Sequence, residues 1–511
     1  MKNYIRQCNL KKLSLVLTVL YLVSLIPLLI LSWYNYPAAD DFSMALETHL
    51  KYVQTGSMLH AFAENLAMTW HYYTKWMGYF TADFLMSMPP SVFGERFYML
   101  GTWFLLGMFS FGTVYFMHAL LVKAAGMNRY AVRCIAMLVM FITVQCMQEG
   151  SQRVEAFYWY AGAINYFFLY GLGLVYLGLL ISAVYDESSR KRGYDVVMAS
   201  VLGFLMGGAN YMSALSCAII SALLLFYILL FKLNLTPADL QPEKNKRKRI
   251  KVLSIPAIMM LIGFACSCMS PGNQYRAVGL TAINPIKAIV ISLYYTLSYA
   301  VGEWTTWSVL CLLLLTLPIL WVMVRETSFR FQHPFVAVIF AYGMVSANIT
   351  PPLYAEGNIA AGRIQSIFWA QYLLCLILVM GYLMGWFQRR IGYPVGVRKS
   401  EVNLSLSGSR FCAVLVILWI FGSSLSAGVN PYYYSATSAV TDLINGKAEA
   451  YAQQWKERYN VLHDSSVKNV EFGELTEKPE LLFFSDISDD ENDWANLAMC
   501  KYFRKNRIVR K

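Results

Sequence analysis

Long hydrophobic runs without charge recur along this sequence and restrict its fold more than any other feature. The first, from Leu13 to Leu31, contains no charged residue, and about 20 apolar residues let an α-helix cross a hydrocarbon core of roughly 30 Å. We therefore predict an all-α polytopic membrane protein with about eleven transmembrane helices, counted by hydropathy and charge bias. The other predicted spans lie at about Phe97–Val122, Cys134–Met147, Ile164–Tyr185, Val196–Gly208, Met212–Phe231, Leu253–Met269, Ser308–Val324, Pro334–Ile349, Ile364–Phe387 and Phe411–Ala427.

The distribution of basic residues indicates membrane topology and argues against nucleic-acid binding. Hydrophobic residues make up 57% of the chain, charged residues make up 14%, and the net charge is +12. Lysines and arginines form short clusters between the hydrophobic runs, which is typical of cytoplasmic loops. We interpret the strongest cluster, Lys244 to Lys251, as a topology determinant in preference to a phosphoinositide or nucleic-acid patch.

The amino-terminal segment predicts the orientation of the chain. Basic residues between Lys2 and Lys12 precede the first run, but no small-residue cleavage site follows, so we expect a retained signal anchor with a cytoplasmic amino terminus. The first loop then lies outside, and eleven crossings place the carboxyl terminus outside as well. Segment Pro285 to Val301 is expected to be interfacial or re-entrant, because a crossing there would put the basic RETSFR cluster outside.

Two extracytoplasmic parts are expected to be folded. Phe42 to Met88 is too polar for a lipid-exposed span and suits amphipathic helices in the membrane interface. Residues 1–429 would form the transmembrane domain, and residues 430–511 a small α/β region. In that region ELLFFSDI predicts a short strand, and Asp442 to Tyr459 predicts a helix.

The adjacent carboxylates Asp40 and Asp41 follow the first span and are the predicted catalytic residues. Burial and a neighbouring like charge raise a carboxyl pKa, which suits a general base that accepts a proton from a sugar hydroxyl. The alternative is a helix cap, since aspartate is favoured at that position. We expect one of the two, with Asp40 preferred, to be the base.

Other polar motifs fall on the same predicted side of the membrane as the aspartate pair. Arginine suits phosphate oxygens, and aromatic rings suit sugars, so these motifs supply a candidate substrate site. The alternatives are pairing of the arginines with Glu149, Glu155 or Glu356, and an interfacial aromatic belt. The predicted substrate-binding residues are Lys75, Trp76, Glu149, Arg153, Glu155, Trp159, Asn273, Arg276 and Arg363.

Metal and cofactor motifs are weak in this sequence. Most of the 10 cysteines lie within hydrophobic runs, and Cys266 and Cys268 lack the spacing of a zinc site. We predict no required cofactor and no metal ligands among the site residues. A divalent cation such as Mg²⁺ or Mn²⁺ is chemically compatible with paired carboxylates and phosphate oxygens.

An ordered set of motifs resembles a known superfamily. A first span followed by an outer carboxylate pair, many further spans and a small external carboxyl-terminal part resemble the GT-C membrane glycosyltransferases. The set YPAADDFS, WMG, AFYWYAGAINY, SPGNQYR and CKYFRKNRIV is more closely similar to an uncharacterised bacterial family grouped with O-antigen glucosyltransferase-like proteins. That family usually has an arginine after the tryptophan and glycine of the first loop, where this chain has Tyr79, and Lys75 could replace it.

This resemblance implies a reaction class and a location. The protein would be a multi-pass protein of the bacterial cytoplasmic membrane, and would transfer a sugar from a polyprenyl-phosphate donor to an envelope glycan or lipid acceptor. The first-loop aspartate would be the base, which corresponds to Asp40 or Asp41. Two other classes stay open: a transporter or flippase of envelope lipid-linked substrates, which predicts an internal repeat, and a non-catalytic membrane scaffold.

Overall fold

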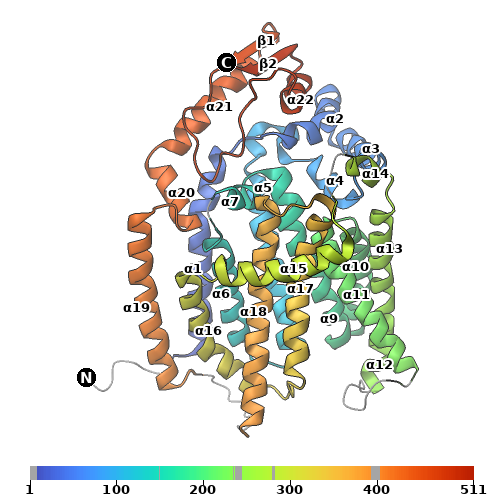
Figure 1. Ribbon diagram of the computed structural model, residues 1–511, viewed down its shortest axis with the longest axis vertical. Helices are drawn as coiled ribbons and strands as arrows, with labels where there is room; N and C mark the ends of the chain where they lie inside the picture. Colours follow the sequence, from blue (N-terminus) through green and yellow to red (C-terminus); the bar gives the residue numbers. More distant parts are fainter. Residues whose placement is uncertain (1–7, 149, 234, 236–243, 279–281, 393–402) are drawn as a thin grey trace.

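The computed structural model describes residues 8–148, 150–233, 235, 244–278, 282–392 and 403–511, and it consists almost entirely of helices. Long helices stand side by side in a bundle, with a smaller region above one end (Figure 1). Nine segments of the described chain are long and apolar enough to cross a membrane. They contain α1 (Leu10–Leu31), α5 (Leu100–Met117), α9 (Leu169–Tyr185), α11 (Tyr211–Lys232), α13 (Ser254–Cys268), α16 (Trp307–Arg325), α17 (Pro334–Glu356), α18 (Gly362–Arg390) and α19 (Leu406–Val429).

Two further predicted spans correspond to helices that do not meet that test. Helix α6 (Arg129–Gln145) has 17 residues and packs against α1 and α16, while α10 (Ser189–Gly207) begins with the polar sequence SRKRGYD and packs along α9 and α13. The fold is therefore that of an all-α polytopic membrane protein. The count of eleven spans stays a prediction.

The two ends of the bundle differ in chemistry. The first residues of α1 and the basic helix α12 (Lys244–Val252) lie at one end (Figure 1). At the opposite end lie α2 (Asp40–Thr55), α3 (Met58–Lys75), α4 (Phe80–Met86) and α14 (Gly272–Ala277). Short helices between the spans complete this end: η1 (Ser32–Tyr34), η2 (Pro90–Phe93), η3 (Glu95–Phe97), α7 (Ser151–Phe157) and α8 (Tyr160–Ala163). The aspartate pair and the strongest basic cluster are thus at opposite ends, as their predicted topology requires.

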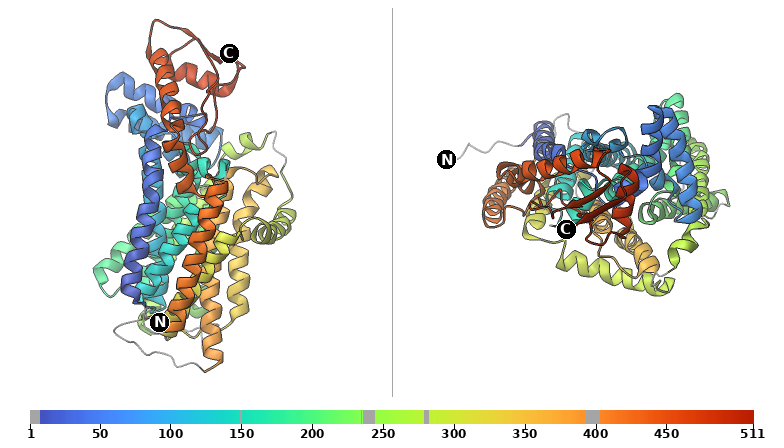
Figure 2. Two further views of the ribbon diagram at one scale, coloured as in Figure 1. Left: turned by 90° about the vertical axis from the view of Figure 1, so that its left-hand side faces the viewer. Right: turned by 90° about the horizontal axis from the view of Figure 1, so that it is seen from above.

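Helix α15 (Pro285–Gly302) lies across the bundle, whereas its neighbours α17 and α18 run along it (Figures 1 and 2). Pro285 is the first helical residue, where the missing N–H of proline costs no hydrogen bond. The side chain of Asn284 caps the helix by accepting from the backbone N–H groups of Ile286 and Lys287. This orientation agrees with the prediction that the segment is interfacial or re-entrant.

The carboxyl-terminal region after α19 is a small helical unit with one short sheet. It contains α20 (Ser435–Ile444), α21 (Lys447–His463), β1 (Asn469–Phe472), α22 (Trp494–Phe503) and β2 (Arg507–Arg510). Strands β1 and β2 are parallel, with Val470 opposite Ile508. Aromatic contacts join this region to the membrane domain. The ring centres of Tyr36 and Trp455 are 5.9 Å apart, and those of His49 and Tyr502, which are stacked, are 3.9 Å apart.

Two local predictions for this region are wrong. The sequence ELLFFSDI forms a turn and extended loop instead of a strand, because Leu481 and Leu482 are both buried and the N–H of Leu482 bonds to the carbonyl of Pro479. The helix predicted from Asp442 to Tyr459 is divided into α20 and α21. Gly446 separates them with φ 73°, a left-handed conformation that favours glycine and ends the helical hydrogen-bond pattern.

Candidate functional site

The aspartate pair begins helix α2 directly after a strained turn. Ala39 has φ 48° and ψ −115°, and such a conformation costs a residue with a side chain about 1–3 kcal/mol. Two contacts hold the preceding residue in place. A carboxylate oxygen of Asp41 accepts from the N–H of Ala38 at 3.0 Å, and the indole N–H of Trp159 donates to the carbonyl of Ala38 at 3.2 Å. The segment around Trp159 therefore fixes the backbone that presents the aspartates.

Asp41 supports this turn with both of its carboxylate oxygens. It is buried and accepts hydrogen bonds from the N–H of Ala38, the hydroxyl of Tyr98 and the N–H of Ala161. Burial raises the pKa of Asp41 to about 7, although these three hydrogen bonds act in the opposite direction. The geometry thus assigns Asp41 to the structure of the turn, although not as the helix cap that was the predicted alternative, because the N-cap of α2 is Ala39 without a side-chain cap hydrogen bond.

Asp40 is half-buried, and within the described chain its carboxylate makes no hydrogen bond. Burial raises its pKa, while the positive charges of Arg363 and Arg276 lower it. The two guanidinium groups come from helices α18 and α14, which are distant in sequence from α2. Asp40 is therefore a carboxylate without a hydrogen-bond partner among the described residues, and the charges of two arginines influence it.

Arg276, on α14, is held by three different contacts. It donates to a carboxylate oxygen of Glu356 at 3.1 Å, it lies 3.6 Å from the sulfur of Met77, and its guanidinium lies 5.5 Å from the ring centre of Trp76. About a third of the side chain is still exposed. The sequence motifs around Trp76 and Arg276 thus meet in space, with the guanidinium accessible beside them.

The WMG turn is fixed against the end of α13. The N–H of Gly78 donates to the side-chain oxygen of Asn273 at 2.9 Å, and the hydroxyl of Ser267 donates to the carbonyl of Gly78 at 2.8 Å. A Cβ on Gly78 would lie 2.0 Å from the carbonyl oxygen of Ser267, so only glycine fits. Because Asn273 also accepts from Tyr211, its side chain is a brace that positions the loop.

Arg363 lies in the first turn of α18 and is paired with Glu155 of α7. The carboxylate of Glu155 accepts from the N–H of Gly362, the N–H of Arg363 and the guanidinium of Arg363, the last at 2.8 Å. The guanidinium also lies 5.3 Å from the ring centre of Trp159. Glu155 is almost fully buried, whereas Arg363 is about one-third exposed. The pair therefore fixes the arginine and leaves part of it accessible.

A cavity of about 550 Å³ lies beside Arg276 and Glu356, whereas Asp40 and Arg363 are not part of its lining. Its polar side is formed by Tyr79, Asn273, Arg276 and Glu356, and Tyr79 occupies the position where the resembled family has arginine. The rest of the lining is mostly apolar and comes from α11, α13, α15 and α17, including Leu215, Phe264, Pro285, Ile289 and Pro351. The cavity can accommodate a ligand with an anionic group at Arg276 and a hydrophobic chain.

Asp83 is a candidate functional residue that the sequence did not single out. It lies on α4 with no exposed area, and neither carboxylate oxygen has a hydrogen-bond partner. Burial raises its pKa well above the usual range, and only the charge of Arg276 acts against this. The charges of Asp83 and Asp40 both raise the pKa of Tyr72, so the two carboxyl groups lie in the same part of the structure. The signal in the sequence was a lone acidic residue among the apolar residues of FTADFLM.

Replacing Asp83 with asparagine is expected to stabilise the protein increasingly as the pH rises. When the pKa of a carboxyl group is higher in the folded state than in the unfolded state, the free energy of unfolding decreases as the pH rises toward the folded-state pKa. The decrease is up to about 1.4 kcal/mol per pH unit. The measurement is the unfolding temperature of full-length wild type and Asp83→Asn from pH 5.5 to pH 9. The unfolding temperature of Asp83→Asn should rise relative to that of the wild type as the pH increases. For the control Ser87→Ala, which changes no charge, the difference from the wild type should stay constant. A difference that shrinks with rising pH would contradict the assignment.

The other predicted substrate residues do not join this group. Lys75 is exposed, with its ammonium 5.3 Å from the ring centre of Tyr275, and it does not line the cavity. Arg153 is 1% exposed and bonds to carbonyl oxygens of residues 147, 432 and 433. Its predicted role as a phosphate contact is therefore corrected to a structural one, because its donors are used within the protein. Glu149 lies outside the described residues.

The aspartate pair does not form a joint ligand set for a metal ion. Both oxygens of Asp41 are engaged in hydrogen bonds, so only Asp40 of the pair offers a carboxylate. Across the described parts of the chain, the structure contains no group of three or more His, Cys, Asp or Glu residues that could hold a metal ion.

Comparison of the chain with protein-family models and with curated proteins found no match. The class of protein that fold and site define is thus an all-α polytopic membrane protein with a charged, partly apolar cavity near one end of its helix bundle.

Proposed function

We propose that the protein is a GT-C-type membrane glycosyltransferase that moves a sugar from a polyprenyl-phosphate donor to an envelope glycan or lipid acceptor. One observation supports this most strongly: the carboxylate of Asp40, without a hydrogen-bond partner in the described chain, is influenced by two partly exposed arginines. A base beside positive charge is the combination that glycosyl transfer from a lipid phosphate requires. The order of motifs that resembles GT-C enzymes supports the same reaction.

The shape and chemistry of the cavity favour a lipid-linked donor. A donor phosphate would lie at Arg276, whose planar guanidinium can donate to two phosphate oxygens. The prenyl chain would occupy the apolar part between α11, α13, α15 and α17, which are segments of the membrane domain. Because the volume of about 550 Å³ exceeds the space that a sugar ring needs, a tail-bearing substrate fits better than a free sugar.

In the proposed reaction Asp40 accepts the proton of an acceptor hydroxyl. The hydroxyl oxygen forms a bond to the anomeric carbon of the donor sugar while the bond from that carbon to the phosphate oxygen breaks. The electron pair leaves with the polyprenyl phosphate, whose developing negative charge is stabilised by Arg276 or Arg363. Attack on the side opposite the leaving phosphate inverts the configuration at the anomeric carbon. Trp159 and Glu155 act by positioning Arg363.

The test is glycan analysis of the cell envelope from a deletion strain complemented with the wild-type gene or an empty vector. The expected result is the loss of one sugar substituent in the deletion strain and its return with the wild type. Accumulation of the sugar-loaded polyprenyl phosphate should accompany the loss, because the donor is no longer consumed. An unchanged glycan in a strain that normally produces the protein would refute the enzyme. If the protein is a flippase instead, the deletion strain should keep the loaded carrier on the inner leaflet. A membrane-impermeant label would then fail to reach it.

A further inference from the structure

A second cavity lies toward the end of the bundle that holds the first residues of α1 and helix α12, far along the helices from Asp40. It has a volume of about 410 Å³ and lies between the end of η4 (His118–Ala124), the start of α6 and the last turns of α16 and α18. Nothing in the proposed reaction uses it. Helices α16 and α18, which contribute to its lining, are both long and apolar enough to cross a membrane.

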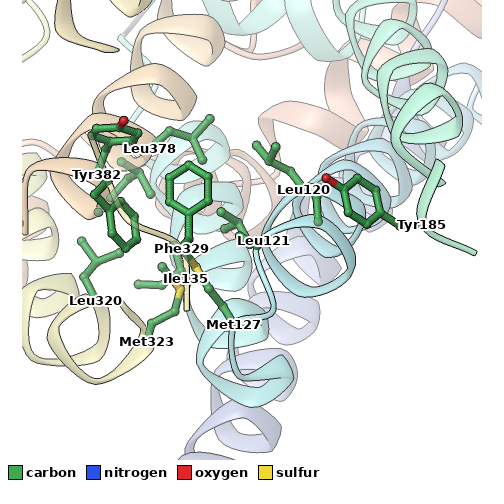
Figure 3. A pocket seen from close by; sticks show the side chains of 15 residues that line it. Leu120, Leu121, Met127, Ile135, Tyr185, Leu320, Met323, Phe329, Leu378 and Tyr382 are labelled. Carbon is green, nitrogen blue, oxygen red and sulfur yellow. The ribbon is translucent and has the colours of Figure 1, made fainter. Parts of the chain in front are cut away.

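The lining of this cavity is hydrophobic almost throughout. Figure 3 shows Leu120, Leu121 and Phe329 facing the space between the rings of Tyr185 and Tyr382. The hydroxyl of Tyr382 donates to the carbonyl of Gln332, so it is already satisfied within the protein. An apolar space of this size does not hold ordered water, and an empty one lowers stability in proportion to its volume. A hydrophobic occupant is therefore favoured.

Positive charge lies at the Tyr185 side of the cavity. The ammonium of Lys246, on α12, lies 5.1 Å from the ring centre of Tyr185. Arg249 on the same helix donates to the carbonyl of Val184 at 2.9 Å and so fixes α12 against the end of α9. The helix KNKRKRIKV has no acidic residue. Lys123, at the end of η4, is paired with Asp186 at 2.6 Å.

We propose that this cavity binds one acyl chain of an anionic phospholipid whose phosphate headgroup contacts Lys246. The hydrophobic lining favours an acyl chain, and the basic helix favours a negatively charged headgroup. The cavity and the helix meet at the ring of Tyr185. Basic clusters next to spaces between membrane helices are suited to anionic headgroups. The cluster from Lys244 to Lys251 then has a binding role in addition to its role in topology. This site is independent of the proposed transferase reaction.

Native mass spectrometry of the full-length protein tests the site with two lipids that share the same acyl chains, phosphatidylglycerol and phosphatidylcholine. The wild type is expected to retain phosphatidylglycerol about fivefold more than phosphatidylcholine, the preference that one basic residue near the headgroup provides. Lys246→Glu should remove that preference and leave phosphatidylcholine retention unchanged. Lys248→Glu makes the same charge change on the same helix and serves as its control, with the preference retained.

A second pair of variants tests the cavity itself. Gly381 lines the cavity, and a Cβ there would have its nearest contact at 3.5 Å from Leu320, so Gly381→Leu can place a side chain in the space. This variant should lower the retention of both lipids several-fold. Gly343→Leu, at a helical glycine with nothing within 4 Å of its Cβ, should leave retention unchanged. Equal retention of the two lipids by the wild type, or full retention by Gly381→Leu, would overturn the proposal.

Discussion

Replacing Asp40 with asparagine is expected to lower the rate of sugar transfer by about 100- to 10,000-fold, the usual contribution of a general base. The variant should fold normally, because the Asp40 carboxylate makes no hydrogen bond in the described chain. The amide of asparagine keeps the size of the side chain and cannot accept the proton of the acceptor hydroxyl. The measurement is the turnover of a labelled polyprenyl-phosphate sugar by full-length protein in liposomes with an envelope acceptor fraction, together with the unfolding temperature.

Two matched variants show whether the loss is specific to Asp40. Glu47→Gln removes one exposed carboxylate from the same helix and should leave the rate unchanged. Asp41→Asn should lower the unfolding temperature, because the amide nitrogen cannot accept the hydrogen bonds that the buried carboxylate receives from Ala38, Tyr98 and Ala161. Wild-type turnover by Asp40→Asn would remove Asp40 as the base.

The pH dependence of the wild-type rate should also report on Asp40. A base acts only when deprotonated, so the rate should decrease as the pH falls through the pKa of Asp40. Burial raises that pKa, while Arg363 and Arg276 lower it. The acid side of the pH profile therefore reflects both the burial of Asp40 and the two arginines that would bind the leaving phosphate.

The long hydrophobic runs made most of the fold predictable. Their lengths determine where helices can span, and each of the nine membrane-length helices in the described chain falls on a predicted span. The prediction for α15 depended on basic clusters, because hydropathy alone does not distinguish a spanning helix from one that lies across the bundle. The carboxyl-terminal region was less predictable. A single conformation at Gly446 divides its helix, and paired burial of Leu481 and Leu482 excludes the expected strand.

The candidate site was predictable only in part, because residue type indicates chemistry but not which donors are already used. Arg276 and Arg363 pair with Glu356 and Glu155, which was the alternative to a substrate contact, but both guanidinium groups stay partly exposed and influence the pKa of Asp40. Arg153 has the same chemistry but forms its hydrogen bonds within the protein. Asp83 was overlooked for the opposite reason. Its importance depends on complete burial without a partner, which only tertiary packing reveals.

The side chain of Arg153 joins the membrane domain to the carboxyl-terminal region. From α7 its guanidinium donates to the carbonyls of Tyr432 and Tyr433, both at 2.6 Å, and to the hydroxyl of Ser438 at 3.0 Å. It also lies 3.6 Å from a carboxylate oxygen of Glu480. The same region places Phe484 on the ring of Trp159 at 3.9 Å, next to Arg363. Release of the region would therefore disturb the candidate site.

Replacing Arg153 with methionine should destabilise the docked region by about 3–5 kcal/mol, because several carbonyl groups and the Glu480 carboxylate lose the hydrogen bonds and the ion pair that a buried guanidinium gives them. The measurement is limited proteolysis of the full-length protein in detergent. In the variant, the protease should cut faster within the region that follows Val429. Arg507→Met is the control. Arg507 pairs with Glu471 and Glu491 on an exposed surface, where solvent screening leaves such pairs little effect on stability. Wild-type resistance of Arg153→Met to the protease would show that the aromatic contacts of Tyr36, Phe42 and His49 suffice for docking.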